Sequence, residues 1–223
     1  MFDSYWIILL IGVALGGITQ AWVNGSFKRY SQVPLATGQS GAEVARRMLD
    51  AEGLHRVGIE RVAGHLSDHY DPRSNVLRLS EAVYDGRTVA AAGVAAHEAG
   101  HAVQHAHSFV FARIRQALVP TAQLGSSLAF PLIFAGIILN FGDLVTVGAI
   151  VFAAAVLFQI ITLPVEFDAS RRAMVALSSG NALPQEQLAG ARTVLSAAAM
   201  TYLAATLVAI MQLVYYLGLG RRG

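Results

Sequence analysis

The charged residues of this chain leave long uncharged stretches between them, and these stretches limit the folds that it can adopt. Lys, Arg, Asp and Glu are absent between Asp3 and Lys28, between Arg115 and Asp143, between Asp143 and Glu166, and between Arg192 and Arg221. Each stretch is longer than the roughly 20 apolar residues that are needed to cross a hydrocarbon core. We therefore predict four membrane-spanning helices, at about residues 4–23, 117–141, 144–163 and 194–219.

The composition also indicates an integral membrane protein. Of the 223 residues, 55% are hydrophobic and 13% are charged, and this charged fraction is about half that of a typical soluble domain. The second and fourth stretches contain polar residues such as Gln123 and Gln212, which bundled helices tolerate when a neighbouring helix provides hydrogen bonds. No basic segment precedes the first stretch and no small-residue cleavage site follows it, so we interpret it as an uncleaved anchor. The absence of cysteine excludes a disulfide framework.

Most of the Lys and Arg residues that flank the predicted spans lie in two connecting segments, 28–115 and 164–193. These residues are Lys28, Arg29, Arg113, Arg115, Arg171, Arg172 and Arg192. Because basic residues collect on the cytoplasmic side of a membrane protein, both segments are predicted to be cytoplasmic and the N-terminus to lie outside. Arg221 and Arg222 favour the opposite orientation.

Two helices are predicted within segment 28–115. Ser40 and Glu43 have the spacing of a capping box, in which the side chain of each residue accepts a hydrogen bond from the backbone amide of the other. Gly53 suits the left-handed residue that follows a helix. Residues 88–107 are rich in Ala and predict the second helix.

A small β-hairpin is predicted between these two helices. β-Branched and polar residues partly alternate in residues 57–66, and the alternation resumes in residues 76–79. The residues between 71 and 75 read Asp-Pro-Arg-Ser-Asn, which is typical of a turn.

Residues 97–101 read His-Glu-Ala-Gly-His and fall within the second predicted helix. Positions four apart share a helix face, so His97 and His101 can direct their rings at one metal ion. Zn²⁺ lowers the pKa of a bound water toward ~7, and Glu98 is placed to take its proton as a general base in peptide hydrolysis. The alternative is a polar face of a buried helix whose histidines form hydrogen bonds and bind no metal.

A catalytic zinc site requires a third protein ligand and leaves one position open. His105 shares the helix face, but it lies about 12 Å from His97 along the axis, too far for both rings to reach one ion. Glu166 is the better candidate, since a carboxylate at the edge of an apolar span is costly unless it has a partner. Pro164 before it suits the first turn of a new helix or a kink. The alternative is that Glu166 compensates the dipole of that helix.

Several of these runs resemble a known family. They are LSDHYDPR at 66–73, AAHEAGHAVQH at 95–105, TLPVEFDASRRA at 162–173 and AAAMTY at 197–202. Together they resemble the bacterial YugP-like neutral zinc metallopeptidases, over nearly the whole chain and in order. That family is similar to the wider gluzincin peptidases, such as the HtpX-type quality-control proteases and the CAAX prenyl proteases.

The resemblance implies His97, His101 and Glu166 as ligands of one catalytic Zn²⁺, with Glu98 as general base. In the relatives an Asp four residues after the ligand Glu often orients the first His. Here Ser170 occupies that position and Asp168 lies two residues before it, so either residue could support the site. His105 is expected to be a surface residue or to support the ligands from behind.

The relatives also place a substrate-binding edge strand before the metal helix, and the hairpin around residues 68–80 has that position here. An extended peptide could add to it as a strand. Asp68, His69 and Tyr70 could then face the cleft, and a Tyr hydroxyl or a His could stabilise the oxyanion. The alternative is that Asp68 and Asp71 only stabilise a tight turn.

The sequence therefore predicts a mainly α-helical integral membrane protein with four transmembrane helices and a gluzincin-like cytoplasmic metallopeptidase module, forming one domain over residues 1–223. We predict that it is a zinc metalloendopeptidase of the cell membrane that acts on membrane or membrane-proximal proteins. The alternatives are a non-catalytic zinc-binding scaffold and a zinc transporter. The expected partners are a polypeptide substrate and the lipid bilayer, without nucleic acid. The sequence does not decide whether the protein forms a homo-oligomer or binds an adaptor protein.

Overall fold

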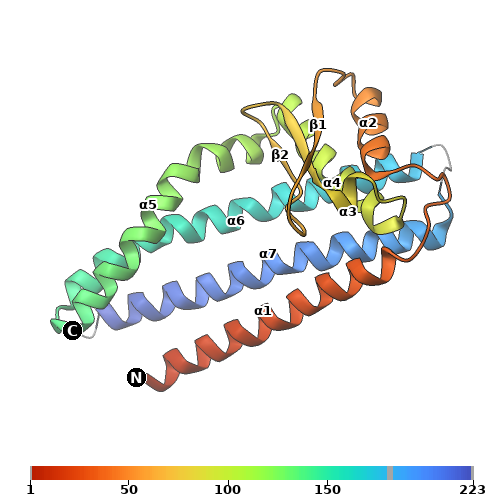
Figure 1. The fold of residues 1–223 in the computed structure, drawn as a ribbon. Helices are drawn as coiled ribbons and strands as arrows, with labels where there is room; N and C mark the ends of the chain where they lie inside the picture. Colours follow the sequence, from red (N-terminus) through yellow and green to blue (C-terminus); the bar gives the residue numbers. More distant parts are fainter. Residues whose placement is uncertain (1, 180–182, 222–223) are drawn as a thin grey trace. The chain divides into compact units, whose positions relative to one another are not determined.

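The computed structural model describes residues 2–179 and 183–221, with the side chains of residues 2–4 excluded. Arg222 and residues 180–182 of the predicted cytoplasmic segment lie outside the described part. The long helices are α1 (Phe2–Tyr30), α5 (Val110–Ile138), α6 (Gly142–Ser178) and α7 (Gln185–Gly220). The shorter helices are α2 (Gly41–Ala51), α3 (Glu81–Tyr84) and α4 (Val89–Ala106). The strands are β1 (Gly58–Val62), β2 (His69–Asp71) and β3 (Val76–Ser80) (Figure 1).

Within the described residues, four helices are long and apolar enough to cross a membrane. They are Tyr5–Tyr30, Val110–Ile138, Gly142–Ser178 and Gln185–Gly220. Helices α1, α6 and α7 contain their predicted spans and extend beyond them, whereas α5 begins earlier than predicted, at Val110, and ends at Ile138, short of the predicted end at residue 141. Pro164 lies inside α6, so the structure excludes one of the two roles expected for it, the first turn of a new helix. Proline in a helix interior removes one backbone hydrogen bond, but the turns on both sides of Pro164 continue the helix.

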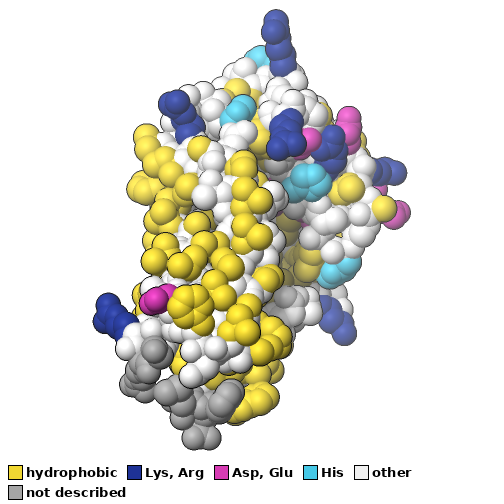
Figure 2. All heavy atoms as spheres, turned by 90° about the vertical axis from the view of Figure 1, so that its left-hand side faces the viewer, with side chains coloured by type: hydrophobic (Ala, Val, Ile, Leu, Met, Phe, Trp, Pro, Cys, Tyr) yellow, Lys and Arg dark blue, Asp and Glu magenta, His cyan; other side chains and the backbone are white. Residues whose placement is uncertain are grey.

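Large hydrophobic side chains are exposed along the apolar helices. On α5 they include Leu124, Leu128, Phe134 and Ile138, and on α1 they include Leu10 and Val13. Figure 2 shows such side chains over much of the visible surface. Contiguous apolar surface of this extent is unfavourable in water and suits contact with lipid.

The chain divides into two compact units. Unit 1 comprises Met1–Thr19, Arg113–Pro164 and Thr201–Gly223. Its core includes Ile133 of α5 and Val145 and Phe152 of α6. Gly148 has no side chain to separate these helices, since a Cβ there would lie 2.9 Å from the backbone nitrogen of Ile133. Small residues at such contacts are typical of helix packing in membranes.

Unit 2 comprises Gln20–Ala112 and Val165–Met200, and it contains the small sheet with α2, α3 and α4. The capping box of α2 is confirmed: Glu43 N donates to Ser40 Oγ (3.3 Å), and Ser40 N donates to Glu43 Oε2 (2.7 Å). Gly53 has the predicted positive φ, at 73°. The core of this unit is formed by Val44 and Leu49 of α2, by alanines of α4, and by Leu77 and Leu79 of β3.

The sheet has three strands in the order β1-β3-β2, so the predicted hairpin is only partly right. β1 and β3, the two strands recognised from the sequence, are parallel neighbours. The hairpin is formed by β2 and β3, which are antiparallel. Because β2 has only three residues, it is too short to show an alternating pattern. The chain reaches it through a loop in which Leu66 has a positive φ of 54°.

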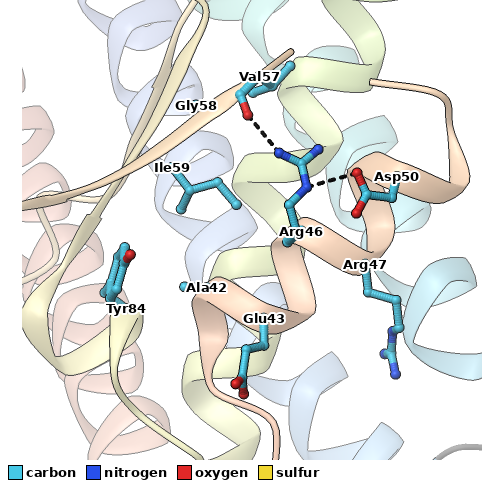
Figure 3. A pocket seen from close by; sticks show the side chains of 9 residues that line it. All are labelled: Ala42, Glu43, Arg46, Arg47, Asp50, Val57, Gly58, Ile59 and Tyr84. Atoms are coloured by element: carbon cyan, nitrogen blue, oxygen red, sulfur yellow. Dashed lines mark hydrogen bonds and ion pairs between the residues drawn. The ribbon is translucent and has the colours of Figure 1, made fainter. Parts of the chain in front are cut away.

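A pocket of about 710 Å³ lies between α2 and β1 and contains none of the predicted site residues (Figure 3). Arg46 of α2 donates to the carbonyl oxygens of Leu54 and Val57, both at 2.8 Å. Its Nε lies 2.9 Å from Asp50 Oδ1. These contacts attach α2 to the segment that leads into β1.

Candidate metal centre

Helix α4 carries the His-Glu-Ala-Gly-His run. The hydroxyl of Thr88 accepts a hydrogen bond from Ala91 N (3.3 Å) and caps the N-terminus. Small alanine side chains then pack against the rest of unit 2. His97 and His101 lie one turn apart on this helix, with ring centroids separated by 4.8 Å.

Helix α6 passes close to α4 at Gly100. A Cβ at that position would lie 2.8 Å from the carbonyl oxygen of Ala169 and 3.2 Å from its Cα. Any larger residue would therefore push the two helices apart. The sequence did not assign Gly100 this role, because the close approach depends on a helix some seventy residues further along the chain.

The close approach brings Glu166 of α6 to the two histidines of α4. Glu166 Oε2 lies 3.3 Å from His97 Nε2 and 3.6 Å from His101 Nε2. The ligand atoms of the three residues all lie within 4.8 Å of one another. Two donors bound to one tetrahedral Zn²⁺ at about 2.1 Å are separated by roughly 3.4 Å. The donor set and its spacing therefore fit a zinc ion.

The site is nearly closed to solvent and rich in negative charge. The exposed fractions of the side chains are 3% for Glu166, 13% for His97 and 16% for His101. Burial raises the pKa of Glu98; the two histidines oppose this shift, while the charges of Glu166 and Asp68 add to it. Burial alone would lower the pKa of His101, but its hydrogen bond to Glu166 and the charge of Glu98 raise it overall. The negative charges of these carboxylates would stabilise a cation that binds at the site.

The second nitrogen of each histidine ring also has a hydrogen-bond partner. His97 Nδ1 lies 3.1 Å from Ser170 Oγ, and His101 Nδ1 lies 3.0 Å from Gln104 Oε1. Ser170 and Asp168 of α6 were the two candidates for orienting the first histidine, and Ser170 is the one that lies beside it. Asp168 instead accepts a hydrogen bond from Gln104 Nε2 at 3.0 Å. Such partners behind the ligands orient the rings in metal sites.

Gln104 was not singled out from the sequence. Two features of the sequence could have indicated it. Gln104 is a polar residue in an alanine-rich helix, and it lies three residues after His101, which places both side chains on neighbouring parts of one helix face.

The residues predicted to bind substrate lie on or next to β2. Asp68 accepts hydrogen bonds from Ser80 N (2.7 Å) and Ser80 Oγ (3.0 Å), so its carboxylate holds the end of β3. His69 is exposed, and its Nδ1 lies 2.8 Å from the carbonyl oxygen of Ser67. The hydroxyl of Tyr70 donates to Asn75 Oδ1 at 2.8 Å.

His105 lies beside Tyr70, with its Nδ1 3.2 Å from the tyrosine hydroxyl oxygen. Among the described residues, the cluster suited to a metal contains His97, His101 and Glu166 and does not include His105. This agrees with the axial separation on one helix that argued against His105 as the third ligand.

The fold and the site define a membrane protein with a cluster of two partly buried histidines and one buried glutamate. Residues 5–221 match the family described as "Putative neutral zinc metallopeptidase". The chain belongs to this family, which confirms the resemblance seen in the sequence. It is 43% identical over 213 residues to a Bacillus subtilis (strain 168) protein named "Putative membrane protease YugP", covering 94% of this chain and 95% of that protein. No solved structure shows a significant match.

Proposed function

We propose that this chain is a membrane-embedded zinc metalloendopeptidase that hydrolyses peptide bonds in membrane or membrane-proximal proteins. The observation that carries the proposal is the convergence of His97, His101 and Glu166, with Glu98 adjacent on α4. Three protein ligands leave the fourth position of a tetrahedral zinc open, as in catalytic sites. Membership of a zinc metallopeptidase family supports both the metal and the reaction.

In this proposal His97, His101 and Glu166 hold the ion and Glu98 moves the proton. A bound Zn²⁺ would supply Lewis acidity, polarising the scissile carbonyl and lowering the pKa of water. As the water oxygen bonds to the carbonyl carbon, a carboxylate oxygen of Glu98 takes up its proton. Glu98 then delivers that proton to the leaving nitrogen as the C–N bond breaks.

We assign the α4–α6 site and the small sheet to a gluzincin-like module, with β2 as the strand that receives the substrate. β2 lies at one edge of the sheet and pairs only with β3 among the described strands. The contact between Tyr70 and His105 holds β2 beside α4. An extended peptide could add to the free edge of β2, with main-chain hydrogen bonds providing affinity with little dependence on sequence.

We further propose that the module faces the cytoplasm and forms one functional domain with the membrane helices. The distribution of Lys and Arg supports this orientation. The four apolar helices would keep the enzyme close to its membrane-bound substrates. The bilayer and a polypeptide substrate are thus its proposed partners.

The test replaces Glu98 by Gln, which preserves size but removes the proton acceptor. We expect E98Q to retain one zinc per chain, measured by elemental mass spectrometry, and to lose cleavage of unfolded membrane-protein substrates in detergent by at least about 100-fold. The control is Glu81→Gln, which changes an exposed glutamate on α3 in the same way. Cleavage by E98Q at the rate of the E81Q control would refute the mechanism.

A further inference from the structure

Gln104 is a fully buried polar residue on α4, with no exposed surface. Burying an amide is costly unless its donors and acceptor are satisfied. Its Nε2 donates to the carbonyl oxygen of Val165 (2.7 Å) and to Asp168 Oδ2 (3.0 Å). Its Oε1 lies 3.0 Å from His101 Nδ1. The side chain thus connects α4 with α6 directly behind the metal cluster.

These partners fix which way the amide faces. A carbonyl oxygen and a carboxylate oxygen can only accept hydrogen bonds, so both must face the NH₂ group of Gln104. The amide oxygen is therefore directed at His101 Nδ1, which must carry a hydrogen to donate. The lone pair of neutral His101 is then on Nε2, the nitrogen that faces Glu166. Ser170 cannot impose a tautomer on His97 in this way, because a hydroxyl both donates and accepts.

Asp168 is itself held in place by two arginines of α6. Arg172 Nε lies 2.6 Å from Asp168 Oδ2, and Arg171 Nη2 lies 2.5 Å from Asp168 Oδ1. The side chains of Asp168 and Arg172 are 10% and 23% exposed, so water screens this pair less than the pair with Arg171, whose side chain is 68% exposed. The two arginines therefore hold the Asp168 carboxylate in place toward Gln104, and a carboxylate accepts a stronger hydrogen bond than a neutral group does.

The contact with Val165 extends this network to the third ligand. Val165 directly precedes Glu166, so a bond to the Val165 carbonyl holds the backbone from which the ligand carboxylate extends. One side chain therefore constrains a ring on α4 and a ligand on α6, two elements far apart in the sequence.

We propose that Gln104 is a positioning residue of the metal site, which fixes the tautomer of His101 and couples it to Glu166 through Val165 and Asp168. The inference rests on the proposed zinc site but not on the proposed peptidase activity. Residues behind the ligands typically change metal affinity about 10–100-fold when they are replaced.

The first test is Gln104→Met, which keeps the length of the side chain and removes all three hydrogen bonds. We expect the zinc affinity of the purified protein, measured by competition with a chromophoric chelator, to fall about 10–100-fold. The visible spectrum of the Co²⁺-substituted protein should also change, because it reports the ligand geometry. The matched control is Gln32→Met, at an exposed glutamine of unit 2. Thermal unfolding of the metal-free proteins reports any loss of fold separately.

A double-mutant cycle distinguishes positioning from a general structural role. Asp168→Asn weakens the arginine pairs and should reduce zinc affinity when Gln104 is present. It should have little further effect in the Gln104→Met background, because the path to His101 is already interrupted. Additive losses from the two substitutions would overturn the inference.

The remaining outcomes separate this inference from the proposed function. If Gln104→Met binds zinc as tightly as Gln32→Met, with an unchanged Co²⁺ spectrum, the inference is wrong and the peptidase proposal stands. If the wild type binds zinc but cleaves no substrate, the peptidase proposal fails and the affinity comparison still decides the role of Gln104. A wild type that binds no zinc would overturn both.

Discussion

The contact between Gly100 and Ala169 gives the sharpest test of the packing that forms the candidate metal site. Gly100→Ala adds one methyl group to α4, and its Cβ would lie 2.8 Å from the Ala169 carbonyl oxygen. The atom it meets belongs to the backbone of α6, so no side-chain rotation can relieve the overlap. The helices themselves must separate.

The size of the effect follows from this distance. Reaching an ordinary contact of 3.4 Å requires the helices to separate by about 0.6 Å. Glu166 lies less than one turn from Ala169 on α6, so it moves away from His97 and His101. Metal–ligand distances tolerate only about 0.2 Å of change. Overpacking costs about 1–3 kcal/mol, partly offset by roughly 1 kcal/mol from the higher helix propensity of Ala. We expect zinc affinity to fall at least about tenfold, or ~1.4 kcal/mol.

Gly93 on the same helix provides the control. A Cβ there would lie 3.7 Å from the nearest atoms of Ala191, which is ordinary contact. Gly93→Ala therefore gains the same helix propensity without separating any elements. The assay is zinc affinity by chelator competition in mild detergent, together with thermal unfolding with and without zinc. If Gly100→Ala and Gly93→Ala bind zinc equally tightly, the close approach of α4 and α6 does not hold the site together, and the argument fails.

Two further predictions concern the third ligand and the hairpin. Glu166→Ala should abolish or greatly weaken zinc binding, measured as metal per protein by elemental mass spectrometry; a full zinc content would require a different third ligand. Asp71→Asn should lower the midpoint of thermal unfolding at pH 7, because Asp71 accepts hydrogen bonds from Arg78 (2.8 Å) and Ser74 (2.7 Å). These contacts hold the pKa of Asp71 below its usual range, so its stabilising effect is present above about pH 4 and is lost as the pH falls further. The difference in midpoint between Asp71→Asn and wild type should therefore shrink in acid, and a difference that is independent of pH would contradict this explanation.

The membrane helices and the family were predictable because their signals are local. Uncharged stretches longer than a bilayer crossing mark the four apolar helices wherever they pack. The capping box of α2 involves residues three apart and needs no distant partner. The sheet shows the opposite case. β2 has only three residues and is a strand because β3 lies beside it, so neither its existence nor the parallel pairing of β1 with β3 could be deduced from periodicity.

The candidate site divides in the same way. A spacing of four on a helix is enough to place His97 and His101 on one face, and the cost of a carboxylate beside an apolar stretch indicated Glu166. The folded arrangement was needed to show that Glu166 lies beside both rings, that Ser170 and not Asp168 lies beside His97, and that the Gln104 amide oxygen lies 3.0 Å from His101 Nδ1. These contacts depend on the close approach at Gly100, which joins two helices far apart in the chain, because hydrogen bonds of about 3 Å require that approach to within a few tenths of an ångström.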